Sequence, residues 1–407
     1  MRLRLFSLLL LPIALFASLN FDSRHEKESG IVAAFDINPM FLQDPMLKRM
    51  RERTASLYHS RSFFGAMDDA YLFLPLVKHI ITKAGLPEEF IFLAMAESHF
   101  TARACSDKSA SGVWQFMEGT GRRYGLKIDD YVDERLDLVK STRAAVRYLS
   151  DLYDRFGKWY LAAIAYNCGE GRLNRAIKRA GSDDLTVLLN ERKKYLPRES
   201  RDYMRKIVTL ALMGTDKSTL FSREYDYLIN RGKASSLASV AVGRGETLAR
   251  VAKLLDMPMR DLKNLNHHLK YGFTPPYSHS YNVYIPYVKL SEFKEKYTPG
   301  DLHRMYLVHI VEPGDNLSKL GKHYRVPYRS IMDFNNLKSS RLSLKQKLII
   351  PVDKGYVPPS ERRYTVKEGD TLSSIAKAFH LSVSQLKRIN QLDSHIIKIG
   401  ETLSLYD

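Results

Sequence analysis

Apolar and polar positions repeat three times in the C-terminal half of the chain. Each repeat opens on a Gly-acid-Thr/Asn-Leu pattern and has an asparagine at one fixed interval after it. After the opening leucine, apolar residues recur with a helical period, and short β-type stretches such as His309-Ile310-Val311 flank the repeats. Each repeat is therefore predicted to form strand, helix, helix and strand, over residues 238–286, 307–351 and 363–406. The openings and asparagines are Gly245-Glu246-Thr247-Leu248 with Asn266, Gly314-Asp315-Asn316-Leu317 with Asn335, and Gly369-Asp370-Thr371-Leu372 with Asn390.

In the N-terminal half, an apolar stripe predicts a helix over residues 86–100. Pro87 suits the first helical position, and the acidic residues after it suit the positive end of the helix dipole. Phe90, Leu93, Ala94 and Glu97 fall at i, i+3, i+4 and i+7, so the Glu97 carboxyl shares a face with apolar side chains. Burial raises the pKa of a carboxyl, as a general acid near neutral pH requires. On this stripe alone, a Glu97 that ends the helix and faces solvent or an arginine is the better interpretation.

The first residues have the pattern of an export signal. A short basic stretch, Met1 to Arg4, precedes an apolar run from Leu5 to Phe16 and the small residues Ala17 and Ser18. The run is shorter than the roughly 20 apolar residues that a membrane-spanning helix needs, so we expect a signal peptide over residues 1–18 rather than a retained anchor. Because no cysteine follows the run, lipidation is not predicted. The protein is expected to be exported, to the periplasm or the cell envelope.

Composition then narrows the class of partner. The 407 residues are 44% hydrophobic and 27% charged, which is typical of a folded protein, and 63 Lys and Arg against 45 Asp and Glu give a net charge of +18. Such an excess favours a polyanion: nucleic acid, an anionic membrane or an acidic wall polymer. Export argues against nucleic acid. Metal-ligand spacing and phosphate-binding glycine loops are missing from the sequence, so we expect no metal and no cofactor. Cys105 and Cys168 are compatible with a disulfide or with two free thiols.

The three repeats resemble the LysM module, a small βααβ domain that binds glycans containing N-acetylglucosamine. The second and third match closely, whereas the first has a longer segment, His267 to Tyr281, before its last strand and is interpreted as a degenerate module. The repeated Gly, Leu and Asn are interpreted as structural. Sugar contact would come from the loops around residues 314–316 and 369–371 and from the turn after the second helix. Stretches rich in Pro, Gly and charge, near 296–301 and 353–361, predict flexible tethers.

The ordered motifs of the N-terminal half resemble the soluble lytic transglycosylase family, whose catalytic domain has the all-helical goose-type lysozyme fold. The resemblance covers about residues 71–214, after an N-terminal helical or linker segment at 19–70. The predicted fold class is therefore multidomain α+β, with an all-α lysozyme-like catalytic domain followed by βααβ LysM modules. Glu118, where the family usually has Pro, and Cys105 depart from the pattern. The motifs are Glu97-Ser98, Ser106, Ser111-Gly112-Val113-Trp114-Gln115-Phe116-Met117, Ala165-Tyr166-Asn167 and Tyr203.

The resemblance implies a role for each matching residue. Glu97 would protonate the glycosidic oxygen between N-acetylmuramic acid and N-acetylglucosamine and then act as base, while the muramoyl C6 hydroxyl closes onto C1. Tyr166 and Tyr203 would orient the Glu97 carboxyl. Ser106 and Gln115 would bond to the sugar; Met117 and Asn167 could contact the sugar or could equally serve packing and capping. Trp114 and Phe116 are expected in the core.

Three functions remain open at this point. A single obvious carboxylate agrees with a substrate-assisted transglycosylase, because ordinary glycosidases use two. Asp107, Glu118 and Glu170 follow in sequence and are interpreted as surface charges. A hydrolytic muramidase on the same fold is the first alternative, and a non-catalytic peptidoglycan-binding protein is the second. The partner in each case is the glycan strand of peptidoglycan.

Overall fold

The computed structural model describes residues 25–58, 72–215, 236–298, 304–353, 356 and 363–405, apart from 102, 107, 108, 277, 336 and 380. The predicted signal peptide lies outside these residues. Within them, none of the helices has the length and apolarity to cross a membrane. The predicted tethers near 296–301 and 353–361 fall largely outside the described ranges, so their flexibility stays a prediction.

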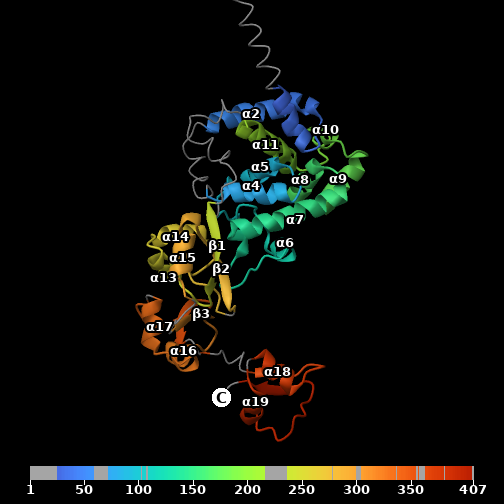
Figure 1. The fold of residues 1–407 in the computed structure, drawn as a ribbon. Coiled ribbons are helices and arrows are strands. Elements are labelled where there is room, and N and C mark those ends of the chain that lie inside the picture. The colour runs from blue at the N-terminus through green and yellow to red at the C-terminus, as the bar shows by residue number, and fades with distance from the viewer. Residues whose placement is uncertain are drawn as a thin grey trace, which may run out of the picture. The chain divides into compact units, whose positions relative to one another are not determined.

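Helices make up the N-terminal half of the molecule (Figure 1). Residues 25–34 are helical and lead through a 3-10 turn, Pro39–Gln43, to the first labelled helix. Further 3-10 turns lie at Glu88–Phe90 and Glu134–Leu136. The helices are α2 Pro45–Tyr58, α4 Leu74–Lys83, α5 Ile91–Ser98, α6 Glu118–Arg123, α7 Leu138–Phe156, α8 Trp159–Cys168, α9 Glu170–Ala180, α10 Leu185–Leu188 and α11 Arg198–Thr215.

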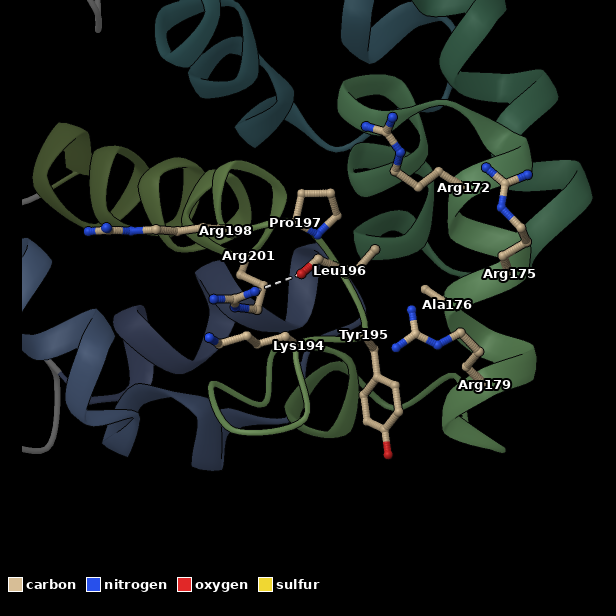
Figure 2. A pocket seen from close by; sticks show the side chains of 10 residues that line it. All are labelled: Arg172, Arg175, Ala176, Arg179, Lys194, Tyr195, Leu196, Pro197, Arg198 and Arg201. Carbon is tan, nitrogen blue, oxygen red and sulfur yellow. Dashed lines mark hydrogen bonds between the residues drawn. The ribbon is translucent and has the colours of Figure 1, made fainter.

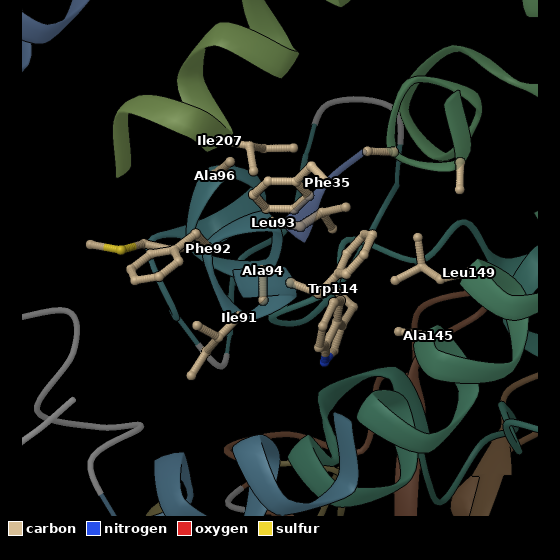
Figure 3. Packing of buried hydrophobic residues seen from close by; sticks show 14 of the residues in the cluster. Phe35, Ile91, Phe92, Leu93, Ala94, Ala96, Trp114, Ala145, Leu149 and Ile207 are labelled. Atoms are coloured by element: carbon tan, nitrogen blue, oxygen red, sulfur yellow. The ribbon is translucent and has the colours of Figure 1, made fainter. Parts of the chain in front are cut away.

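Helix α5 lies in the middle of this helical domain, with α11 packed on one side and α4 on another (Figure 1). Every side chain from Ile91 to Ala96 is buried, so the helix is enclosed on all faces rather than along one stripe. The predicted helix start at Pro87 is a 3-10 turn, and the α-helix begins at Ile91. Side chains of α5, α7 and α11 meet Phe35 and Trp114 in the core (Figure 3).

The segment before α4 belongs to the same core. Phe90 packs edge-on against Phe35, with 5.5 Å between ring centroids, and against Trp159 at 5.2 Å. Phe41 and Leu47 are also buried in this cluster. Residues 25–54 therefore complete the helical domain, because their apolar side chains fill the space beside the turn that precedes α5.

A small strand-and-helix module follows the helical domain. It consists of β1 Leu237–Gly243, α13 Leu248–Leu254, α14 Met259–Leu265 and β2 Ser280–Pro286, and continues into a 3-10 turn and α15 Leu290–Lys296. The two strands pair antiparallel, with Val240 opposite Val283. This module and the helical domain form one compact unit.

The long segment of residues 267–281, which leads into β2, explains why this module and the helical domain form one unit. The backbone N–H of Lys270 donates to the Tyr131 carbonyl at 3.0 Å, and that of Asp133 donates to the His268 carbonyl at 2.9 Å. Val132 and Leu269 form a β-bridge between these two bonds. The insertion that distinguishes this repeat from the other two is therefore an element that docks onto the helical domain.

Buried polar groups reinforce the same contact. The Tyr284 hydroxyl donates to the Asp137 carboxylate at 2.9 Å, and Asp137 is the N-cap of α7, accepting from the N–H groups of Val139 and Lys140. The Tyr281 hydroxyl donates to Glu134 at 2.7 Å. The start of α7 is thus fixed by the module as well as by its own domain.

The two remaining modules have separate cores and the predicted strand–helix–helix–strand order. Each contains one antiparallel strand pair, with Leu307 opposite Ile350 in the first pair and Tyr364 opposite Leu403 in the second. The predicted fold class, an all-α domain followed by βααβ modules, is confirmed. The elements are β3 Arg304–Ile310, α16 Leu317–Tyr324, α17 Tyr328–Phe334 and β4 Lys347–Asp353, then β5 Arg363–Thr365, α18 Leu372–Ala378, α19 Val383–Ile389 and β6 Thr402–Ser404.

The repeated asparagine has the same structural role in all three modules. Asn335 lies just after α17, where its side-chain nitrogen donates to the carbonyls of Ile331 and Ile349, and its oxygen accepts the N–H of Ile349 at 2.7 Å. Asn266 and Asn390 make the corresponding three bonds. One side chain therefore ends a helix and holds the last strand against it.

Candidate active site

The predicted acid lies in the last turn of α5, where α11 passes beside it. The Tyr203 hydroxyl, on α11, donates to Oε1 of Glu97 at 2.5 Å. A charge-assisted O–H···O bond of this length fixes the carboxyl orientation. Three residues further along α11, Lys206 donates from Nζ to the Ala96 carbonyl and so lies next to the same turn.

Burial controls the ionisation of Glu97. Desolvation raises the pKa of this carboxyl from 4.5 to about 7, against the opposing effects of the Tyr203 hydrogen bond and the Lys206 charge. The nearby Glu199 carboxylate adds to the increase. At neutral pH the group is thus divided between the acid and its conjugate base, which suits proton donation followed by proton removal.

A pocket of about 660 Å³ opens onto Glu97. Tyr203, Asn167 and Lys206 line it from α8 and α11, and α2 lines it with Met46, Met50 and Thr54, together with Arg49 and Arg53. Asn167 is tied to α11, because its Oδ1 accepts a hydrogen bond from Ser200 Oγ at 2.8 Å. The sequence analysis did not predict that α2 lines this pocket. The four-residue spacing of Met46, Met50 and Thr54, which places them on one helix face, was the signal that could have indicated it.

The loop of residues 111–117 is held beside the end of α5. Ser98 Oγ donates to the Val113 carbonyl at 2.9 Å, and the Tyr166 hydroxyl donates to the Trp114 carbonyl at 2.7 Å. At Gly112, with φ of +81°, a Cβ would lie 1.9 Å from the Arg135 carbonyl oxygen, so only glycine fits. Tyr166 therefore positions this loop rather than bonding to Glu97.

Arg135 connects the same loop to the first LysM-like module. Its guanidinium donates to the Ser109 carbonyl at 2.9 Å and the Phe116 carbonyl at 3.2 Å, and it pairs with the Asp133 carboxylate at 2.7 Å. Asp133 in turn donates its N–H to His268 in the docking segment. A chain of buried contacts thus runs from the module to the loop.

The other predicted sugar contacts lie along this loop. Ser106 is exposed, and its Oγ accepts the Ala110 N–H at 3.1 Å. Gln115 has φ of +47°, and its side-chain nitrogen donates to the Gly112 carbonyl at 2.8 Å. Met117 is 47% exposed at the N-cap of α6. Trp114 and Phe116 are buried in the core, as expected.

The other acids near these motifs have separate surroundings. Glu118 is exposed and pairs with Arg122 at 2.8 Å, and Glu170 pairs with Arg155. Asp107 lies outside the described residues. Cys105 and Cys168 are free thiols. Among the described residues, no three His, Cys, Asp or Glu side chains gather as they would around a metal ion.

Comparison with known protein families divides the chain in the same way. Residues 78–188 match the transglycosylase SLT domain. Residues 236–301 match the LysM-like domain of the lytic transglycosylase MltD, and residues 309–351 and 364–405 match the LysM domain.

Proteins of known function are similar to all or part of this chain. Membrane-bound lytic murein transglycosylase D of Escherichia coli K12 is 29% identical over 400 residues, which cover 93% of this chain and 86% of that protein. The peptidoglycan transglycosylase gp16 of Escherichia phage T7 is 34% identical over 121 residues, or 29% of this chain and 9% of that protein. The 70 kDa soluble lytic transglycosylase of E. coli is 23% identical, with a TM-score of 0.29, over 36% of this chain and 25% of the other.

Proposed function

We propose that this chain, a lytic transglycosylase with an SLT domain and LysM modules, cleaves the β-1,4 bond between N-acetylmuramic acid and N-acetylglucosamine in peptidoglycan and leaves a 1,6-anhydromuramoyl end. The observation that supports this most is Glu97, a partly buried carboxyl with a pKa of about 7 that is oriented by Tyr203 and lines a pocket. The SLT and LysM domains support the substrate class. The raised pKa of this one acid supports the proposed chemistry.

The first step uses the protonated form of Glu97. Its carboxyl transfers a proton to the glycosidic oxygen, the C1–O bond breaks, and the carbonyl oxygen of the substrate's own acetamido group bonds to C1. The departing sugar leaves as an alcohol. A raised pKa favours this step because it keeps a proton on Glu97 near neutral pH.

The second step uses the carboxylate that remains. It removes the proton from the muramoyl C6 hydroxyl, whose oxygen bonds to C1 as the C1–acetamido bond breaks. Lys206 and the Tyr203 hydroxyl favour the charged form of Glu97 during this interval, and both lower its pKa. No water is consumed, and Glu97 is protonated again at the end.

The other acids at this pocket favour this mechanism over a two-carboxylate hydrolysis. Glu199 is exposed, and Asp202 lies 3.4 Å from Arg198 and 3.8 Å from Arg205 in ion pairs. Ordinary glycosidases place a second carboxylate as nucleophile or water-activating base. An ion-paired or exposed acid is poorly placed for either role, so the muramidase remains the second candidate.

The two C-terminal modules are proposed to bind the glycan strand. In the module of residues 304–353, a pocket of about 460 Å³ is lined by His309, Asp315 and His323. Asp315 accepts the Glu312 N–H at 2.8 Å and bonds to His309 at 2.7 Å, so the loop after β3 has a fixed shape. Export to the periplasm or cell envelope, where peptidoglycan lies, belongs to the same proposal.

The test is the isosteric change Glu97→Gln, which keeps the shape but removes the transferable proton. Cleavage of purified peptidoglycan should fall by at least about 10²–10⁴-fold, since one group serves both steps. Circular dichroism should show an unchanged fold. Glu292→Gln is the matched control, because that acid lies on α15 and pairs with Lys289 and Lys296. Near-normal activity of a folded Glu97→Gln protein would remove the basis of the assignment.

A further inference from the structure

A second pocket, of about 540 Å³, lies between α9 and the segment that leads into α11 (Figure 2). Its ten lining residues include six cationic side chains and no acid. Apolar groups complete the lining, with Ala176 and Leu196 buried. The cationic residues are Arg172, Arg175, Arg179, Lys194, Arg198 and Arg201, and the others are Ala176, Tyr195, Leu196 and Pro197.

Three of the arginines are brought to this pocket by the helical period. Arg172, Arg175 and Arg179 are at i, i+3 and i+7 of α9, so they project from one face of the helix. Figure 2 shows all three on the side of α9 that borders the pocket. The buried residues Leu173 and Ala176 hold the helix against the domain and leave this basic face exposed.

The charges of this face are largely uncompensated. Among the ion pairs of the described residues, Arg201 pairs with Glu191 at 2.8 Å and Arg198 lies 3.4 Å from Asp202, but none includes an arginine of α9 or Lys194. Like charges at this spacing destabilise a helix, and Arg172 also lies in the first turn, at the positive end of the dipole. Helix stability therefore does not account for these residues.

The lining fits an anion with several carboxylates on a partly apolar backbone. Guanidinium groups bind carboxylates through two parallel hydrogen bonds, and the Tyr195 ring, 6.0 Å from the Arg179 guanidinium, adds an apolar wall. Arg198 lines this pocket and the Glu97 pocket alike, so the two are neighbours. A group attached to a sugar in the Glu97 pocket could therefore extend into the second pocket.

We propose that the pocket of Arg172, Arg175 and Arg179 binds the acidic stem peptide of peptidoglycan while the glycan strand occupies the Glu97 pocket. The inference rests on the proposed function, since the peptide is attached to the muramoyl lactyl group. That peptide carries free carboxylates and small aliphatic side chains, which match the cationic rim and the apolar floor. The pocket would make the enzyme prefer strands that retain their peptides.

The experiment compares two substrates and two triple variants of the full chain. R172A/R175A/R179A removes three positive charges from the pocket. K178A/R192A/K193A removes three exposed charges from neighbouring positions that line neither pocket. The substrates are purified glycan strands with their stem peptides and the same strands after an amidase has removed the peptides.

For the pocket variant, kcat/KM on peptide-bearing strands should fall by at least about tenfold, because charge-assisted bonds to carboxylates are lost. On strands without peptides, kcat/KM of this variant should equal that of the unaltered protein. The control variant should cleave both substrates normally. Equal losses on both substrates, equal losses in both variants or no loss at all would overturn the proposal.

Two further outcomes distinguish peptide binding from a failure of the proposed function and from binding of a lipid phosphate. If the unaltered protein cleaves neither substrate, the proposed function fails and not merely the peptide pocket. Sedimentation with vesicles of anionic phospholipid tests whether the pocket binds the phosphate of a lipid headgroup instead. Loss of vesicle binding by R172A/R175A/R179A, with unchanged preference between the two strands, would assign the pocket to a lipid headgroup and contradict the peptide.

Discussion

The hydroxyl of Tyr203 has two effects on Glu97 that an experiment can separate. It fixes the direction of the carboxyl, and it lowers the pKa that burial has raised to about 7. Because the protonated form is the acid, kcat/KM should be constant at low pH and fall as the pH rises above about 7.

Tyr203→Phe removes a bond that favours the charged form, so the pKa of Glu97 should rise and the alkaline limb of the pH profile should move upward, by about one pH unit. Tyr166→Phe is the matched control. Its hydroxyl bonds to the Trp114 carbonyl, so this change should lower kcat and leave the limb in place. A limb that moves downward in Tyr203→Phe, or moves equally in both variants, would contradict the geometry.

Single residues could be predicted where a motif or a period specifies them. The stripe put Glu97 on one helix face with apolar residues but alone favoured a solvent-facing acid, and it was the resemblance that assigned Glu97 as the acid and Tyr203 as its partner. The choice of hydrogen-bond partner could not be read, because it depends on loops brought together by the tertiary fold: Tyr166 bonds to Trp114, and the Gln115 nitrogen to Gly112. Lys206 was missed because nothing in the sequence distinguishes it among 63 basic residues.

At the scale of elements, the repeats predicted the order of strands and helices because each repeat has its own periodic core. The asparagines were interpreted as structural, and each lies at the end of the second helix of its module. Their bonds to the final strand could not be predicted, since that pairing joins residues that are distant in sequence. The docking role of residues 267–281 was also hidden, because an insertion in a repeat does not reveal what it contacts.

The union of the first module with the helical domain predicts a shared unfolding transition. Tyr284→Phe keeps the ring that packs on Phe73 but removes the bond to Asp137, which is almost completely buried. A buried acceptor that loses a partner costs about 1–3 kcal/mol, so the Tm should fall by several degrees.

Tyr287→Phe serves as the control for this prediction, because that side chain is 53% exposed. Calorimetry should show one transition for the helical domain and module together, lowered in Tyr284→Phe and unchanged in Tyr287→Phe. A separate low-temperature transition for the module alone, with the main transition unaffected, would show that the contact is only superficial.

At the scale of the whole molecule, two kinds of attraction to the cell wall can be distinguished. The net charge of +18 draws the protein toward an acidic polymer, and the C-terminal modules are proposed to bind the glycan. Removal of residues 307–407 should abolish most retention on insoluble peptidoglycan while cleavage of short soluble strands survives. The cores of the last two modules are separate from that of the helical domain, so this domain should remain folded.

Salt separates the two contributions in the same sedimentation assay. Surface attraction is screened over about 8 Å at physiological ionic strength, whereas hydrogen bonds and stacking in a sugar site depend on salt far less. The full-length protein should stay partly bound at high salt. A truncated protein that pellets as well as the intact one, at low and high salt alike, would show that the modules are not the anchor.

The most direct test of the central claim is the chemistry of the glycan ends that the enzyme releases from purified peptidoglycan. Closure of the C6 hydroxyl onto C1 consumes no water, so the released muramic acid ends should have the mass of one water less than hydrolysis products. They should also resist reduction by borohydride, because a 1,6-anhydro ring has no free aldehyde. Mass spectrometry before and after borohydride treatment measures both properties. Reducible ends with the mass of hydrolysis products throughout would contradict the account and establish a muramidase.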